Sequence, residues 1–184
     1  MNPVLAAAVA GCLATGPMTA VMSGLFRRLP AGERHPLPPR LVTERLLGPL
    51  GLLDGVPEDR RADAALAAHY AYGALTGAGY PLAARVLGGP PVVAGAAYGV
   101  AVWAASYLGW IPATGTLTPA TRHSRRRNAM MIAAHLVWGG ATAALAQTLC
   151  ARPSGFGAPH GATAPVSPAL PEIPEPEAVR MRAW

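Results

Sequence analysis

The segment Asn128–Ala151 has the sequence NAMMIAAHLVWGGATAALAQTLCA and contains no Asp, Glu, Lys or Arg. A helix needs about 20 consecutive apolar residues to cross the roughly 30 Å hydrocarbon core of a bilayer. The segment is long enough, and it is apolar on all sides. A core helix of a water-soluble protein usually keeps one polar face. The segment therefore predicts a transmembrane helix near residues 128–150.

Three further apolar stretches without charged residues lie upstream, at Met1–Phe26, Ala64–Ala84 and Val86–Thr121. The last of these is too long for one span, and its Gly-Gly-Pro-Pro cluster at 88–91 indicates a turn. Ile111-Pro112 indicates a helix exit. We therefore expect an all-α integral membrane protein, a bundle of four transmembrane helices within residues 1–151, with spans near 3–26, 64–84, 92–110 and 128–150.

The composition of the chain supports a membrane protein. Of its 184 residues, 52% are hydrophobic and only 13% are charged, whereas soluble domains average about 25% charged residues. The net charge of +6 comes from arginine, without any lysine. A basic chain can bind nucleic acid, but these arginines flank the apolar segments, so we expect no nucleic-acid partner. Abundant Ala, Gly and Pro are typical of a GC-rich bacterial genome, which indicates a bacterial cytoplasmic (inner) membrane.

The arginines also predict an orientation. The loop 27–63 contains seven of them and the run 122–127 contains four. Because loops rich in arginine stay in the cytoplasm, we expect loop 27–63 to be cytoplasmic and both termini to lie outside. No basic residue precedes the first apolar stretch, so this stretch predicts an anchor and not a cleaved signal peptide. Arg125, Arg126 and Arg127 either act only as a topology signal or also contact anionic lipid head groups.

Two regions lie outside the predicted spans. In the cytoplasmic loop, Pro39 is suited to a helix start. Val42, Leu46, Leu50 and Leu53 follow helical spacing, so the loop forms either a short amphipathic helix on the membrane surface or an irregular segment with apolar anchors. Residues 152–184 are rich in Pro, Ala, Gly and Ser, and this composition predicts a disordered Pro-rich tail.

Two histidines lie inside predicted spans, and each is followed four residues later by glycine. His69 pairs with Gly73, and His135 pairs with Gly139. Residues four apart share one helix face, so each imidazole lies beside a notch where another helix can approach. Both histidines lie about 9 to 12 Å inside the cytoplasmic end of their span. They therefore predict an intramembrane polar site, with possible partners at the same depth in Ser23, Ser106, Thr19 and Tyr107.

Other small residues predict close helix packing. Gly73 and Gly77 form one G-x-x-x-G pair, and Gly95 and Gly99 form another. The repeated order of span, loop and span with H-x-x-x-G suggests an internal duplication into parallel repeats. The two cysteines, Cys12 and Cys150, differ in depth by about 12 Å. We therefore expect neither a disulfide nor a metal site from them.

Several functions are compatible with an intramembrane histidine pair. The imidazoles hydrogen-bond to neighbouring helices in a structural or accessory protein. Alternatively, they line a pathway in a small transporter or proton-linked conductance, or they ligate haem in an electron carrier. No nucleophile–base set indicates an enzyme. The expected partners are the lipid bilayer and either a second copy of the chain or another membrane protein.

The order of these features resembles that of the YagU-like bacterial inner-membrane proteins. The similar segments are Leu37-Pro38-Pro39-Arg40 after the first span, His69 early in the second, Ala94-Gly95 opening the third and His135-Leu136-Val137-Trp138 in the fourth. The resemblance covers roughly the first 150 residues. It implies a multi-span inner-membrane protein, and it implies neither a reaction nor a catalytic residue.

Overall fold

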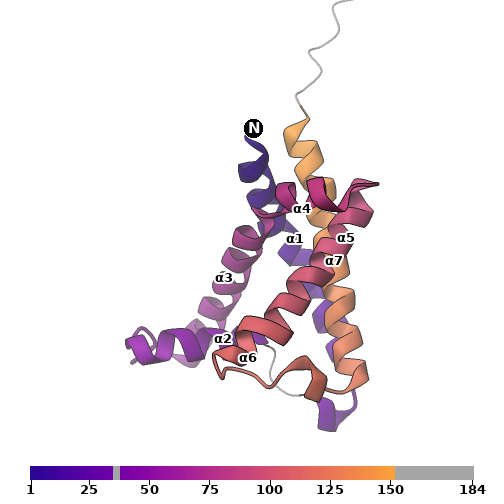
Figure 1. Ribbon diagram of the computed structural model, residues 1–184. Helices are drawn as coiled ribbons and strands as arrows, with labels where there is room; N and C mark the ends of the chain where they lie inside the picture. The colour runs from indigo at the N-terminus through magenta and orange to yellow at the C-terminus, as the bar shows by residue number, and fades with distance from the viewer. Residues whose placement is uncertain (35–37, 152–184) are drawn as a thin grey trace, which may run out of the picture. The chain divides into compact units, whose positions relative to one another are not determined.

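The computed structural model of the protein describes residues 1–34 and 38–151, and these residues form helices and loops without any strand. The long α-helices are α1 (Pro3–Phe26), α3 (Glu58–Gly77), α5 (Pro91–Ala104) and α7 (Arg125–Cys150), and the shorter ones are α2 (Pro38–Leu47), α4 (Tyr80–Leu87) and α6 (Ile111–Ala113) (Figure 1). The all-α prediction is confirmed for this part of the chain. The predicted tail at 152–184 lies outside the described residues.

Three helical segments are long and apolar enough to cross a membrane, and they indicate a membrane protein. They are Pro3–Phe26, Pro91–Ala113 and Arg125–Cys150. The first agrees with the predicted span at 3–26, and the last extends the predicted span at 128–150 by one turn of arginines. The middle one joins α5 to α6 through a π-helical segment, Ala105–Trp110, so it runs past the predicted end at 110.

The predicted single span at 64–84 is wrong in its boundaries. The structure divides this region into α3, which ends at Gly77, and α4, which begins at Tyr80. The break precedes Pro81, whose ring would clash with the Gly77 carbonyl in a continuous helix and which has no N–H to donate to it. At its other end α3 begins at Glu58, because Glu58 and Asp59 occupy the first turn, where acidic side chains favour a helix.

Of the two alternatives for loop 27–63, the structure contains the short helix, α2, and this helix packs against α3. Gly51 ends this region in the left-handed conformation, with φ of 69°. The apolar stripe predicted through Leu50 and Leu53 is not continuous, since Leu50 is 68% exposed and Leu53 is 7% exposed. Arg40 of α2 forms ion pairs with Glu44 and with Glu58 at the start of α3.

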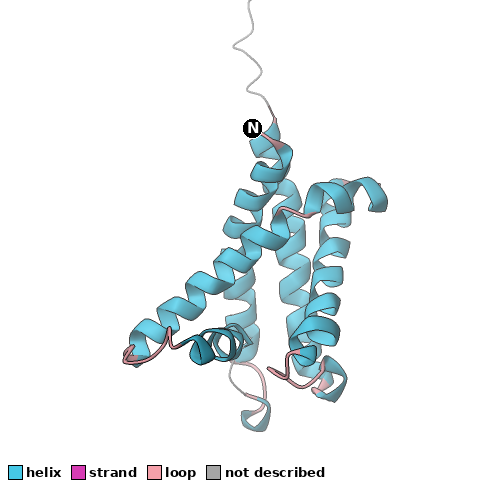
Figure 2. Cartoon of the chain, turned by 60° about the vertical axis from the view of Figure 1, so that its left-hand side comes forward, coloured by secondary structure: helices cyan, strands magenta, loops and turns pink. Residues whose placement is uncertain are grey.

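The long helices pack against one another in the order α3, α1, α7 and α5. α1 packs against α3 on one side and α7 on the other, and α5 packs against α7. Figure 2 shows α3 tilted relative to the other long helices, with α2 beside its N-terminal end. α1 and α5 both run antiparallel to α7. Ala7 and Ala10 near the start of α1 pack with Ala143 and Ala146 near the end of α7, and Gly95 at the start of α5 meets Ala143.

Glycines allow two of these helix pairs to touch through their backbones. A Cβ added to Gly11 of α1 would lie 2.3 Å from the Gly73 oxygen and 2.7 Å from the Gly77 Cα of α3. A Cβ added to Gly95 of α5 would lie 2.4 Å from the Gly139 oxygen of α7. The glycines predicted to pack, Gly73, Gly77, Gly95, Gly99 and Gly139, all lie at these two helix contacts. Gly11 belongs to no G-x-x-x-G pair, so the sequence pattern did not predict its contact.

The two glycine contacts repeat each other position by position. Gly11 meets Gly73 and the residue four further on, and Gly95 meets Gly139 and the residue four further on. The threonines three residues after Gly73 and Gly139 also correspond, since each donates to the carbonyl four residues earlier. The Thr76 hydroxyl lies 2.8 Å from the Tyr72 oxygen and the Thr142 hydroxyl 2.7 Å from the Trp138 oxygen. This correspondence supports an internal duplication that relates α1 to α5 and α3 to α7.

Candidate functional site: a cavity between the long helices

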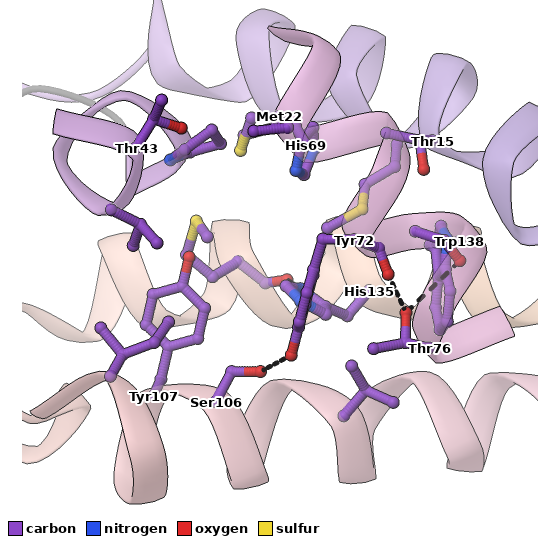
Figure 3. Close-up of a pocket in the computed structure, with 18 of the residues that line it drawn as sticks. Thr15, Met22, Thr43, His69, Tyr72, Thr76, Ser106, Tyr107, His135 and Trp138 are labelled. Atoms are coloured by element: carbon purple, nitrogen blue, oxygen red, sulfur yellow. Dashed lines mark hydrogen bonds between the residues drawn. The ribbon is translucent and has the colours of Figure 1, made fainter. Parts of the chain in front are cut away.

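A cavity of about 220 Å³ lies between the long helices, and residues of α2 line part of it. Most of its wall is apolar, with Met18 and Met22 from α1, Val42 and Leu47 from α2 and Val102 from α5 among the lining residues. Figure 3 shows the polar side chains that reach it from α1, α2, α3, α7 and the π-helical segment after α5: Thr15, Thr43, His69, Tyr72, Thr76, Ser106, Tyr107, His135 and Trp138.

The structure brings both predicted histidines to this one cavity. His69 reaches it from α3 and His135 from α7, together with Ser106 and Tyr107 from the π-helical segment after α5. Ser23 and Thr19 of α1 do not line it. Met18 and Met22 occupy the lining face of α1, and a residue one position further along is turned by about 100° around the helix.

His135 is held in one orientation and has one ring nitrogen free. The side chain is 5% exposed, and its Nδ1 lies 2.7 Å from the carbonyl oxygen of Met131. Because a carbonyl oxygen only accepts, Nδ1 carries the proton and donates it. The ring of Tyr107 packs edge-on at a centroid distance of 6.0 Å. No residue in the described part of the chain hydrogen-bonds to Nε2 of His135.

His69 is less constrained. Its Nε2 is buried and has no hydrogen-bond partner among residues 1–34 and 38–151. An unpaired buried polar group costs about 1 to 3 kcal/mol, and native structures pair most of them. Two imidazoles facing one cavity, each with an unpaired ring nitrogen, therefore indicate a place for an additional hydrogen-bonding group.

Several other polar side chains around the cavity have partners within the bundle. The indole N–H of Trp110 donates to the Tyr72 oxygen at 3.2 Å, and the Tyr72 hydroxyl lies 2.9 Å from the Ser106 oxygen. Thr15 donates to the Gly11 carbonyl of its own helix at 2.9 Å. These bonds satisfy the hydroxyls, and they connect α3 to the end of α5. The sequence gives no sign of these roles for Tyr72 and Trp110, because aromatic residues in an apolar helix equally suit its lipid-facing side.

The charge environment of the cavity favours neutral imidazoles. No Asp, Glu or Arg is among the described residues that line it. An imidazolium there would be a buried charge without a counter-ion, which a low-dielectric site strongly disfavours. His135 is therefore a neutral imidazole with its proton on Nδ1, and its Nε2 can only accept a hydrogen bond.

The cavity is small. Pockets for drug-sized ligands measure about 300 to 1,000 Å³, and this one is below that range. No cluster of three or more His, Cys, Asp or Glu side chains suited to a metal ion occurs in the described part of the chain. Cys12 and Cys150 are both free thiols, as the sequence predicted.

The three arginines at the start of α7 differ in their surroundings. Arg125 and Arg126 are exposed, whereas Arg127 is only 5% exposed. The Arg127 guanidinium donates to the backbone oxygen of Glu33 at 3.3 Å, and the Ser124 hydroxyl donates to the Glu33 carboxylate. Arg127 thus joins the loop that follows α1 to α7, whereas Arg125 and Arg126 have exposed side chains that are available for the predicted head-group contact.

No protein-family model, curated protein or solved structure matches the chain. The likeness to the YagU-like proteins therefore stays a prediction from sequence, and the cavity is the basis for assigning a function.

Proposed function

We propose that this chain is a four-span protein of a bacterial cytoplasmic membrane, similar to the YagU-like proteins, which binds a small and largely apolar molecule in the histidine cavity. The observation that carries the proposal is a pair of imidazoles that line one largely apolar cavity, each with a ring nitrogen unpaired among the described residues. His135 is buried, and His69 is half-buried with a buried Nε2. Such a site combines an apolar wall with a few polar groups, as ligand pockets do. An apolar cavity of about 150 Å³ is large enough to take up benzene, so this one holds a single ring.

The direction of the helices supports a fourth span. α1 and α5 both run antiparallel to α7, so they cross the bilayer in the same direction. The chain must therefore return across the membrane between the end of α1 and the start of α5, and only α3 with α4 is available. The Gly77 end of α3 meets the Ala7 oxygen near the start of α1. Leu75 and Leu82 are 73% and 69% exposed, as expected of lipid-facing side chains.

The geometry favours ligand binding over a purely structural role for the histidines. An imidazole that holds helices together should hydrogen-bond to a neighbouring helix. The hydrogen bond of His135 goes to its own helix, at Met131, and the buried Nε2 of His69 has no partner in the described residues. Transport and storage of the bound molecule both begin with such a site.

Toluene binding to the purified protein in nanodiscs tests the proposal, measured by calorimetric titration with empty nanodiscs as the blank. We expect saturable binding of one molecule per chain. Val102→Phe, which fills the cavity wall, should abolish it. Val93→Phe places the same ring on the same helix at a side chain that is 63% exposed, and this variant should bind as the wild type does. Absence of saturable toluene binding to the wild type would contradict the proposal.

A further inference from the structure

The hydrogen-bonding pattern at His135 restricts the chemistry of the molecule that the cavity takes. Because Nδ1–H is committed to the Met131 carbonyl at 2.7 Å, the neutral ring has a single lone pair left, on Nε2. The partner of that lone pair has to be a hydrogen-bond donor. Carbonyls, ethers and carboxylates offer only acceptors and would meet Nε2 without any bond.

The absence of charged side chains from the described lining restricts the ligand further. A cationic donor such as an ammonium would enter a site with no carboxylate to balance it, and an anion would find no guanidinium. A neutral hydroxyl meets both conditions, since it donates without carrying charge. The volume of about 220 Å³ leaves space for one ring or a short branched chain around that hydroxyl.

We infer that the cavity selects a lipid-soluble phenol or alcohol whose hydroxyl donates to Nε2 of His135. This inference rests on the proposed ligand-binding function. The apolar body of the ligand lies against Met18, Met22 and Val102, and the hydroxyl oxygen keeps lone pairs that can accept from an N–H of His69 or from Tyr107, which line the same cavity. The hydroxyl belongs either to a small free molecule or to the head of a longer lipid.

Phenol and toluene form the matched probe pair, because they differ only in a hydroxyl against a methyl group. Their affinities are measured by the same titration in wild type and in His135→Leu. Phenol is better solvated by water than toluene, and this difference is the same whichever protein is titrated. The quantity to compare between wild type and His135→Leu is therefore the ratio of the phenol affinity to the toluene affinity. We expect the phenol-to-toluene ratio to fall about fivefold in His135→Leu, the factor that one net hydrogen bond contributes. Val93→Phe lies outside the cavity, at a side chain that is 63% exposed, and it should leave the ratio unchanged.

Two outcomes separate this inference from the proposed function. If toluene binds and the ratio is the same in wild type and His135→Leu, the hydroxyl assignment is wrong while the cavity still binds apolar molecules. If neither probe binds wild type, the proposed function itself is wrong.

The ¹⁵N chemical shift of His135 Nε2 in the wild type provides a readout that does not depend on a variant folding. It should move on addition of phenol and stay in place with toluene, and an equal response to both probes would overturn the inference. A phenol with an octyl chain at the para position distinguishes the two sources of the hydroxyl. Binding of this probe would indicate the head of a longer lipid, and loss of binding would indicate a small free molecule.

Discussion

At the scale of single residues, two tryptophans of the bundle differ in their hydrogen bonding: the indole N–H of one has a partner and that of the other has none among the described residues. Trp138 is 2% exposed, and its indole N–H donates to the Gly11 carbonyl of α1 at 3.0 Å. The Nε1 of Trp103 is buried and has no partner in the described part of the chain. We predict that Trp138→Phe destabilises the protein by about 1 to 2 kcal/mol, because it removes a hydrogen bond and buried volume. Trp103→Phe should leave stability unchanged or raise it, since it removes an unpaired donor.

Unfolding in dodecyl sulfate, followed by circular dichroism, measures both tryptophan variants under the same conditions. A larger loss of stability in Trp103→Phe than in Trp138→Phe would contradict the hydrogen-bond assignment.

The sequence predicted part of this residue-scale arrangement. His69 and His135 stand out in apolar segments, and the structure has both of them lining one cavity. Tyr72 and Trp110 could not be found in this way, because helical position alone does not tell a lipid-facing aromatic side chain from one that crosses to another helix. Ser23 was placed at the right depth on the wrong face, since depth follows from counting residues while the facing direction depends on how α1 is rotated against α7.

At the scale of helices, the glycines decide which pairs touch. A Cβ added to Gly99 would lie 2.1 Å from the His135 carbonyl oxygen of α7, whereas one added to Gly24 of α1 would meet nothing within 4 Å. We predict that Gly99→Ala costs about 1 to 3 kcal/mol of unfolding free energy through overpacking. Gly24→Ala should be neutral or stabilising by up to about 1 kcal/mol, as expected for a helical glycine with open space at its Cβ position.

Thermal unfolding of the two alanine variants in one detergent compares them directly. Equal melting temperatures for Gly99→Ala and Gly24→Ala would show that α5 and α7 do not cross at this point. Gly99→Ala should also weaken toluene binding, because any shift of α5 moves Val102 and Tyr107 at the cavity wall.

The sequence predicted helix boundaries correctly where charged residues mark them, and it predicted them wrongly where a proline breaks the helix. α1 ends directly before Arg27, as the charge pattern predicted, and α7 agrees to within one turn. Pro81 breaks the second apolar stretch within a segment that has no charge change, so hydropathy gives no sign of it. The π-helical segment at Ala105–Trp110 likewise leaves no mark in the composition, although it turns Ser106 and Tyr107 toward the cavity.

At the scale of the whole described bundle, the internal duplication explains where the cavity lies. If α1 corresponds to α5 and α3 to α7, the α1–α7 interface has its counterpart between α3 and α5. The first interface is closely packed and is filled by Trp138. In the second, Tyr72 takes the place of Trp138 and bonds to Ser106, and the space beside it is the cavity. The site therefore lies at the interface where the two halves depart from their common pattern.

The direction of the chain through the membrane gives the last prediction. Three spans would place the two ends of the bundle on opposite sides, whereas four spans place them on the same side. Glu33 of the first loop contacts Ser124 and Arg127 at the start of α7, which requires both loops to lie on one side. In a background with Cys12→Ser and Cys150→Ser, we predict that Asn2→Cys and Ala151→Cys react with a membrane-impermeant maleimide on intact spheroplasts. Gly32→Cys and Arg126→Cys should react only after permeabilisation, because the arginine-rich loops stay in the cytoplasm. Labelling of Asn2→Cys without Ala151→Cys would show that α3 and α4 do not cross the bilayer.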